Sequence, residues 1–418
     1  MNIIETDVTD SATKLSQHVA EQKTRSGEAM AAYFYRSHVA YQQELDKLIF
    51  RSWMCAGHSS QIPNAGDYLL FDVGEESIIV TRDAQLKIHA VFNNCRHRGS
   101  RVCEEHQGNR KTFVCPYHGW VYELDGRLKS ARHMESLEGF DPKQHGLEKP
   151  LIEVSHGLIF INCNRNAESL SEEIKKIEIP LAAHELSNAK VAACRNYPVQ
   201  ANWKLVLENY LECYHCATAH RSYANIHTLK DLEQNVKPLN DEVLAHCEEI
   251  TGVKGIGNML YEVYLHGTTE GGGVESFRHA LYPGQLTGSK DGQAVAPLLG
   301  KLKEYDGGVA DFQFGPLTFL VIYPDHGVMY RFTPRSLKET DMTLWWFVRA
   351  DAEEGKDYNL DDLTWLWDKT TKEDEYIIRR NSEGVNSRFY KPGPYHPEFE
   401  YACLDFVDWY LERMSVIN

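Results

Sequence analysis

Two short stretches of sequence, Cys95-Arg96-His97 and Cys115-Pro116-Tyr117-His118, decide the fold, and 17 residues separate them. The first pairs a cysteine with a histidine as C-x-H, and the second does so as C-x-x-H. A glycine follows each pair and a proline lies inside the second, a composition that is typical of tight turns. The sequence therefore predicts two loops that together offer two sulfur and two nitrogen ligands to metal.

Mixed ligation of this kind suits a Rieske [2Fe–2S] cluster, in which two thiolates hold one iron and two imidazoles hold the other. The candidate cluster ligands are Cys95, His97, Cys115 and His118. A zinc site is the alternative, but zinc fingers usually pair like residues, as C-x2-4-C and H-x3-5-H. Because each stretch here carries one ligand of each kind, we favour the iron–sulfur interpretation.

A second group of candidate ligands lies at Glu212-Cys213-Tyr214-His215 and at His220, in a segment that we expect to be helical from Asn202 to His220. Residues five apart on an α-helix point roughly 140° away from each other. The helix must therefore end, or widen into a π-type turn, between His215 and His220 if both are to bind one metal. Glu212 and Asn209 lie three and six residues before His215 and extend its polar face.

Two histidines and one carboxylate on one face of a metal form the facial triad of non-haem iron(II) oxygenases, which leaves positions open for dioxygen. Glu212 could supply the carboxylate, although its position also suits an outer role beside His215. A more distant acid is then required, and spacing alone does not choose it. The candidates are Asp361, Asp362, Asp368, Glu373 and Asp374.

Composition narrows the classes of protein further. The chain has 418 residues, 42% hydrophobic and 25% charged, as in an ordinary globular protein of two or three domains. A net charge of −16 argues against a nucleic-acid partner. With neither a run of about 18 apolar residues nor a basic–apolar start, we expect a cytoplasmic protein with no membrane span. Of the ten cysteines, two are assigned to the cluster, and most of the others should be reduced and buried.

The predicted fold class is α+β, with three parts. Residues 1–45 form an N-terminal helical segment that packs with the catalytic domain, 46–165 form a small antiparallel β domain that carries the cluster, and 166–418 form an antiparallel sheet flanked by helices. Helices are expected at 169–176 and 361–380, and a loop at 268–273. The expected strands are 68–73, 77–82, 87–92, 158–163, 314–330 and 342–350.

The chain resembles the large (α) subunits of Rieske non-haem iron oxygenases from Phe50 to near its end. The motifs that carry this resemblance are Cys95-Arg96-His97-Arg98-Gly99, Cys115-Pro116-Tyr117-His118-Gly119-Trp120, Asn202-Trp203-Lys204, Asn209-Tyr210-Leu211-Glu212-Cys213-Tyr214-His215 with His220, and Asn386-Ser387-Arg388-Phe389-Tyr390-Lys391-Pro392-Gly393-Pro394. By resemblance, the cluster ligands are those named above and the mononuclear iron is bound by His215 and His220. Asp374 best matches the family's third ligand.

The resemblance implies further expectations. An acid three residues before the first iron histidine, here Glu212, links the iron to the cluster of the next subunit, so that electrons cross between chains of a homotrimer. A separate reductase that draws on NAD(P)H supplies the electrons. The substrates are a small molecule and O2.

The substrate is less constrained. Position 212 is Glu, whereas many aromatic-ring dioxygenases have Asp there. In this respect the chain resembles the branch of the family that oxidises quaternary ammonium compounds such as betaines, carnitine or choline. An aromatic cage would recognise such a cation, although strand aromatics more often fill a core. The candidates are Tyr210, Tyr214, Tyr261, Tyr264, Phe312, Phe314, Phe319, Tyr323, Tyr330, Trp345 and Trp346. The alternatives are an aromatic ring-hydroxylating dioxygenase and a Rieske electron-transfer protein without oxygenase activity.

Overall fold

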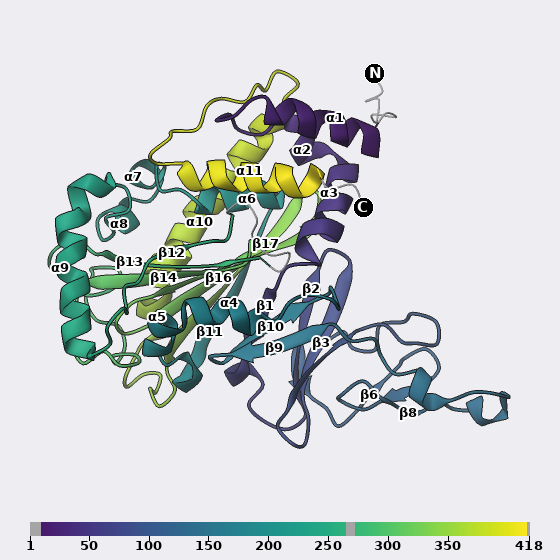
Figure 1. The fold of residues 1–418 in the computed structure, drawn as a ribbon. Coiled ribbons are helices and arrows are strands. Elements are labelled where there is room, and N and C mark those ends of the chain that lie inside the picture. Colours follow the sequence, from purple (N-terminus) through teal and green to yellow (C-terminus); the bar gives the residue numbers. More distant parts are fainter. Residues whose placement is uncertain (1–9, 265–271, 416–418) are drawn as a thin grey trace.

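The structure is a computed structural model that describes residues 10–264 and 272–415. Its N-terminal helices pack beside the C-terminal helix α11 (Tyr401–Ser415), on top of the larger part of the molecule (Figure 1). Serine caps start two of them, because Ser11 and Ser37 accept hydrogen bonds from the backbone N–H groups of Lys14 and Ala40. The elements are α1 (Ala12–Lys23), α2 (Ala32–Arg36), α3 (His38–Glu44) and a π-helical turn, Leu45–Ile49.

Small antiparallel sheets form the part between Met54 and Asn162, as predicted. Their strand orders are β1-β10-β9, β4-β3-β2-β5 and β6-β7-β8. The bounds are β1 (Met54–His58), β2 (Asp67–Val73), β3 (Glu76–Arg82), β4 (Ile88–Phe92), β5 (Gln107–Asn109), β6 (Phe113–Val114), β7 (Val121–Tyr122), β8 (Leu128–Ser130), β9 (Leu151–Ser155) and β10 (Leu158–Asn162), with 3-10 turns at Ser59–Gln61, Met134–Ser136 and Pro142–Gln144. The four predicted strands of this part correspond to β2, β3, β4 and β10.

A seven-stranded antiparallel sheet of order β11-β17-β16-β15-β14-β13-β12 organises the C-terminal part of the described chain. Residues on β15 alternate between its two faces, so that Phe319 and Val321 join one core and Leu320 and Ile322 join the other. The bounds are β11 (Ala189–Val199), β12 (Leu260–Tyr261), β13 (Val274–Ala280), β14 (Gly308–Phe314), β15 (Thr318–Ile322), β16 (Gly327–Ser336) and β17 (Glu339–Arg349). Part of the predicted 314–330 strand is a turn between β15 and β16.

Helices cover this sheet, and the longest is α10 (Leu360–Val385), which contains the predicted helix 361–380 and extends beyond it. Its N-cap is Asn359, whose side chain accepts from the backbone N–H of Asp361 at 2.9 Å. The others are α4 (Leu170–Lys176), α5 (Glu178–Ala183), a 3-10 turn at Leu186–Asn188, α6 (Trp203–Tyr210), α7 (Cys216–Ala219), α8 (Arg221–Ala224) and α9 (Glu233–Thr251). Neither α9 nor α11 was expected from the sequence.

The prediction of one helix from Asn202 to His220 is wrong beyond Tyr210. Asn202 caps α6 as expected, but α6 ends at Tyr210 and an irregular segment leads into the single turn of α7. His215 and His220 are the N-cap and C-cap residues of α7, so the two histidines flank this single helical turn. The predicted loop 268–273 lies mostly outside the described residues.

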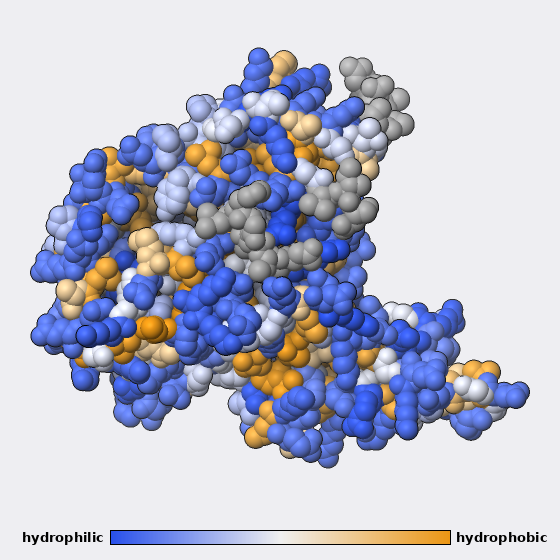
Figure 2. All heavy atoms as spheres, in the orientation of Figure 1, coloured by the Kyte–Doolittle hydropathy of each residue, from blue (hydrophilic) through white to orange (hydrophobic). Residues whose placement is uncertain are grey.

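Hydrophilic side chains dominate the visible surface (Figure 2), in keeping with 60 acidic and 44 basic residues. Of the helices that the structure describes, none has the length and apolar character that crossing a membrane requires.

Candidate metal centres

The two Cys/His loops adopt the same backbone conformation. In the first, which follows β4, the N–H of Gly99 donates to the carbonyl of Cys95 at 2.9 Å, and in the second, between β6 and β7, that of Gly119 donates to the carbonyl of Cys115 at 3.0 Å. Both glycines have positive φ, 78° and 71°, which side chains disfavour. Each loop therefore places its cysteine at the same position of the turn, with the histidine two residues later in the first loop and three residues later in the second.

The cysteines of these loops are buried, and hydrogen-bond donors point at their sulfur atoms. The Tyr122 hydroxyl accepts from the N–H of Arg96 and lies 3.2 Å from Sγ of Cys95, so that its own proton is directed to the sulfur. Burial opposes ionisation of Cys115, but the backbone N–H groups of Tyr117 and His118 lower the pKa of its thiol below the usual value. Burial raises the pKa of the Cys95 thiol instead, so the lowered thiol pKa is confined to the second loop.

The histidines of the loops are exposed and face each other. Nδ1 of His97 lies 3.2 Å from Nδ1 of His118, and each ring stacks on an aromatic neighbour, Trp120 and Tyr117 respectively. Two inner sulfurs and two outer imidazoles match the donor set of a Rieske cluster. The exposed imidazoles leave that side of the site accessible to a partner.

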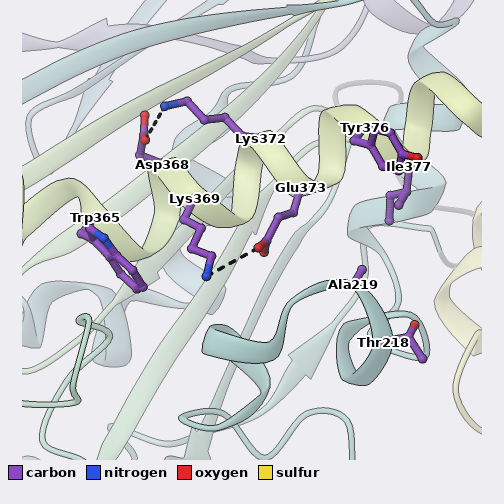
Figure 3. Close-up of a pocket in the computed structure, with 9 residues that line it drawn as sticks. All are labelled: Thr218, Ala219, Trp365, Asp368, Lys369, Lys372, Glu373, Tyr376 and Ile377. Carbon is purple, nitrogen blue, oxygen red and sulfur yellow. Dashed lines mark hydrogen bonds and ion pairs between the residues drawn. The ribbon is translucent and has the colours of Figure 1, made fainter.

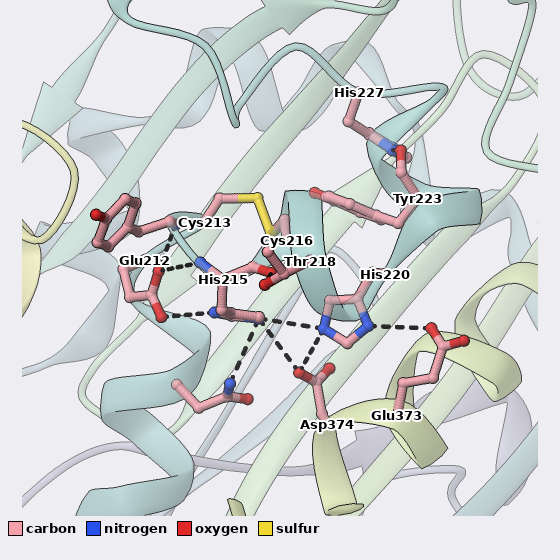
Figure 4. The surroundings of a disulfide bond; sticks show 12 residues. Glu212, Cys213, His215, Cys216, Thr218, His220, Tyr223, His227, Glu373 and Asp374 are labelled. Atoms are coloured by element: carbon pink, nitrogen blue, oxygen red, sulfur yellow. Dashed lines mark hydrogen bonds and ion pairs between the residues drawn. A yellow bond between two sulfur atoms is a disulfide. The ribbon is translucent and has the colours of Figure 1, made fainter. Parts of the chain in front are cut away.

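A second centre lies where α7 meets α10 (Figure 4). Nε2 of His215, Nε2 of His220 and Oδ1 of Asp374 converge, with separations of 3.1 Å between the histidines, 2.8 Å from His220 to Asp374 and 3.5 Å from His215 to Asp374. Ligand atoms about 2.1 Å from one ion lie about 3 Å apart. The three side chains therefore fit a single metal ion.

Two further carboxylates hold the outer nitrogens of these histidines (Figure 4). Oε1 of Glu212 lies 2.5 Å from Nδ1 of His215, and Oε2 of Glu373 lies 3.1 Å from Nδ1 of His220. Glu373, one of the acids considered for the third ligand, thus lies behind a histidine while Asp374 faces the centre. Carboxylates in this outer position fix the orientation of ligating imidazoles.

The charge balance of the centre favours a cation. Burial alone would lower the pKa of His215, but Asp374 and Glu212 outweigh it and raise that pKa to about 9. Burial likewise opposes ionisation of Asp374, yet the two histidines hold its pKa below the usual value. The remaining candidate, Asn209, is at the edge of the group, with Nδ2 3.4 Å from Nε2 of His215.

A cavity of about 790 Å³ opens beside these ligands, within the range of small-molecule sites. Of the candidate aromatics, Tyr210, Tyr261, Phe312 and Phe319 line it. Tyr264, Phe314, Tyr323, Tyr330, Trp345 and Trp346 are buried in the cores instead, and Tyr214 is exposed. Other lining residues carried no sequence signal: the sheet register pairs Phe277 with Asp311, and the packing of α8 and α10 adds Tyr223 and Trp367.

A groove of about 640 Å³ lies on the other side of Glu373, between α7 and α10 (Figure 3). It is lined by charged side chains in ion pairs, with Nζ of Lys372 2.7 Å from Asp368 and Nζ of Lys369 3.7 Å from Glu373. Asp368, another acid considered for the third ligand, therefore lies in this groove and not with the histidines.

The expectation that the other cysteines are mostly reduced and buried is only partly right. Cys55, Cys103, Cys247 and Cys403 are free and buried, whereas Cys163 is half-buried and Cys194 exposed. Cys213 and Cys216 form a disulfide that brackets His215 (Figure 4). Their Cα atoms lie 4.9 Å apart, within the range that a disulfide spans.

Known proteins share this combination of a domain with two Cys/His loops and a domain with a His/His/Asp group. Residues 52–141 match the family described as "Rieske [2Fe-2S] domain", and residues 186–416 match "Ring hydroxylating alpha subunit (catalytic domain)". The glycine betaine monooxygenase oxygenase subunit of Pseudomonas aeruginosa is 33% identical over 91% of this chain and 88% of its own. That of Chromohalobacter salexigens is 34% identical over 91% and 84%.

Solved structures share the fold. A quaternary ammonium Rieske monooxygenase superposes with a TM-score of 0.72 at 20% identity, covering 95% of this chain and 98% of its own. Naphthalene 1,2-dioxygenase from Rhodococcus gives 0.67 at 18% identity, covering 97% and 98%. The two matched domains imply a Rieske cluster and a mononuclear iron as cofactors. The chain belongs to the Rieske non-haem iron oxygenases, as an α subunit of the ring-hydroxylating type.

Proposed function

We propose that this oxygenase hydroxylates an N-methyl group of a small quaternary ammonium compound such as a betaine. The observation that carries the substrate class is the 33–34% identity, over 91% of the chain, to oxygenase subunits named for glycine betaine. An aromatic-lined cavity beside the triad is in keeping with it, because trimethylammonium groups are recognised by ring faces. The reaction takes place in the cytoplasm.

The ligand assignments are part of this proposal. We assign Cys95, His97, Cys115 and His118 to the cluster, and His215, His220 and Asp374 to the iron. A ferrous ion bound by these three side chains would supply the oxygen chemistry. Glu212 and Glu373 orient the two imidazoles, and Asn209 borders the centre. The cavity walls hold the methyl group close to the triad and exclude bulk water.

The overall reaction balances as follows. One methyl C–H bond and O2, with two electrons and two protons, give the hydroxymethyl group and water. The electrons originate from NAD(P)H and arrive through a separate reductase. The hydroxymethyl ammonium then loses formaldehyde and a proton to leave a tertiary amine.

We further propose a homotrimer in which electrons pass between chains. The cluster loops, beside β6 and β8, lie at the opposite end of the molecule from α7 and α8 (Figure 1). A mixing experiment tests this route. A Cys95→Ser chain and an Asp374→Ala chain, each inactive alone, should regain activity in mixed trimers, whereas transfer within one chain predicts none.

Oxygen uptake tests the substrate class. The protein, loaded with both cofactors and supplied with a generic reductase, is assayed with glycine betaine, carnitine, choline and aromatic acids. Formaldehyde released in proportion to oxygen consumed, with one of the N-methyl compounds, supports the proposal. Diol formation from an aromatic acid would instead favour a ring-hydroxylating dioxygenase, and electron transfer without oxygen uptake on any compound would favour a carrier.

A further inference from the structure

One acid on the floor of the cavity has no role in the metal centres. Asp311 is in the middle of β14, where it pairs with Phe277 on β13 and Val321 on β15. All three residues line the cavity that the triad borders. A carboxylate in the centre of a sheet face, between a phenylalanine and a valine, costs free energy of desolvation unless something compensates its charge.

The protein compensates this carboxylate only in part. Nδ1 of His279 lies 3.0 Å from Oδ2 of Asp311, and both side chains are largely buried. Neither atom meets hydrogen-bond geometry with any described group, and Nε2 of His279 is also unpartnered. Buried polar groups in proteins are rarely left unsatisfied. Asp311 therefore retains bonding capacity that faces the cavity.

The other acids that line the cavity are bound to other side chains, are partly neutral, or are exposed to solvent. Glu212 and Asp374 hold histidines of the triad, and Asp231 accepts from the Tyr282 hydroxyl. Burial raises the pKa of Glu275 to about 7, which leaves it partly neutral at physiological pH. Glu233 and Glu398 are exposed at the rim.

Aromatic rings surround the same space. Tyr210, Tyr223 and Trp367 line the cavity with Asp311. Burial, followed by the negative charge of Asp311, raises the pKa of the Tyr210 and Tyr223 phenols. The charge of this carboxylate thus acts on two of the rings that line the cavity. Rings attract a cation through their faces, and a buried anion beside them adds a longer-range attraction.

We propose that Asp311 is the counter-charge that selects a cationic substrate, with its carboxylate facing the quaternary nitrogen while the rings contact the methyl groups. The inference rests on the proposed function and adds a specificity-determining residue to it. Carbon isosteres with the same shape and no positive charge should bind poorly for this reason.

Binding of matched ligands tests the inference without turnover. Calorimetry on the loaded protein measures Kd for glycine betaine against 3,3-dimethylbutanoate, and for choline against 3,3-dimethylbutan-1-ol. Within each pair, a quaternary carbon replaces the nitrogen. The preference for the cation is the ratio of the two Kd values. Asp311→Asn should reduce it about tenfold or more, because a buried charge pair is lost. Residual preference would come from the rings.

One control variant and one substitute variant accompany this test. Asp351→Asn removes an exposed acid that pairs with Arg349 beyond the end of β17, and it should leave the preference unchanged. If Asp311→Asn misfolds, the double variant with His279→Gln removes both buried partners together, which is the milder change. It should show the same loss of preference.

The outcomes separate this inference from the function on which it rests. Wild-type protein that consumes oxygen with an N-methyl compound, combined with an Asp311→Asn variant that keeps the full cation preference, would overturn the counter-charge and leave the function intact. Wild-type protein without cation preference in either pair would also overturn it. Formaldehyde release would still report the function separately.

Discussion

The two metal centres are built from the same imidazole side chains in opposite ways. The cluster loops project from small sheets, with buried cysteines and exposed histidines, and their candidate ligands lie within 24 residues of sequence. The proposed iron triad is largely buried and joins α7 to a residue of α10 that is 154 positions from His220. Three carboxylates surround its two histidines. The first centre is assembled by local turns and the second by the packing of distant elements.

This difference determines how each centre should respond to mutation. The cluster loops depend on their own ligands and on two positive-φ glycines. The triad depends on a layer of outer carboxylates as well, because Glu212 and Glu373 hold the imidazoles in place. Substitutions outside the ligand set should therefore matter more at the triad.

The largest expected effect is that of Cys95→Ser. It should abolish the cluster and with it all substrate-dependent oxygen uptake, because serine is a poor ligand for iron–sulfur iron, and the yield of folded protein should fall as well. Iron and inorganic sulfide analysis, with the visible and electron-spin spectra, measures the loss. Cys103→Ser is the matched control, since Cys103 is buried in the same core but lies outside both loops. Retention of sulfide in Cys95→Ser would refute the assignment.

The sequence alone groups the candidate residues of the first centre, and it groups those of the second only in part. C-x-H and C-x-x-H are contiguous motifs, and the turn residues that shape them lie beside them. Asp374 was one of several acids on a predicted helix, and only the packing of α10 against α7 turns it inward while Asp368 and Glu373 point elsewhere. Asp311 carried no sequence signal, because its partners come from neighbouring strands.

Asp374→Ala should produce the next largest effect. We expect loss of the mononuclear iron and a fall in turnover of more than about 100-fold, with the Rieske spectrum unchanged, because a ligand is removed and two buried histidines lose their anion. Metal content and single-turnover product yield are the measurements. Asp368→Ala, on the same helix, breaks the ion pairs to Arg195 and Lys372 and should keep the iron. Equal iron loss in both variants would contradict the choice of Asp374.

Glu212→Gln should slow turnover by about 10–100-fold while both metals stay bound. The amide keeps a hydrogen-bonding group beside His215 but removes the charge that couples the two centres. Reoxidation of the reduced cluster, followed after mixing with O2 and substrate, reports this coupling. Glu373→Gln is the comparison, because Glu373 supports His220 without a role in the bridge. Equal reoxidation rates in the two variants would reduce Glu212 to a support of the same kind.

The smallest expected effect on turnover is that of a buried acid one turn before Glu212, whose substitution should change stability instead. Burial raises the pKa of Glu208 to about 8, although the Tyr35 hydroxyl donates to it at 2.8 Å. Between pH 4.5 and 8 the unfolded chain therefore releases this proton before the folded one does, so stability falls as pH rises through that window. Glu208→Gln removes the penalty, and the variant should gain about 4 kcal/mol in free energy of unfolding at pH 8 and almost nothing at pH 4.5 or below.

Thermal unfolding of the loaded protein at the two pH values measures this gain. The control on the cluster side is Glu105→Gln, whose exposed carboxylate pairs with Arg110 and has no burial penalty to release. A gain from Glu208→Gln that appears at both pH values would mean that packing, and not a buried charge, limits stability beside the iron. The contrast between a charge-dependent iron region and a loop-built cluster region would then be weaker than the structure implies.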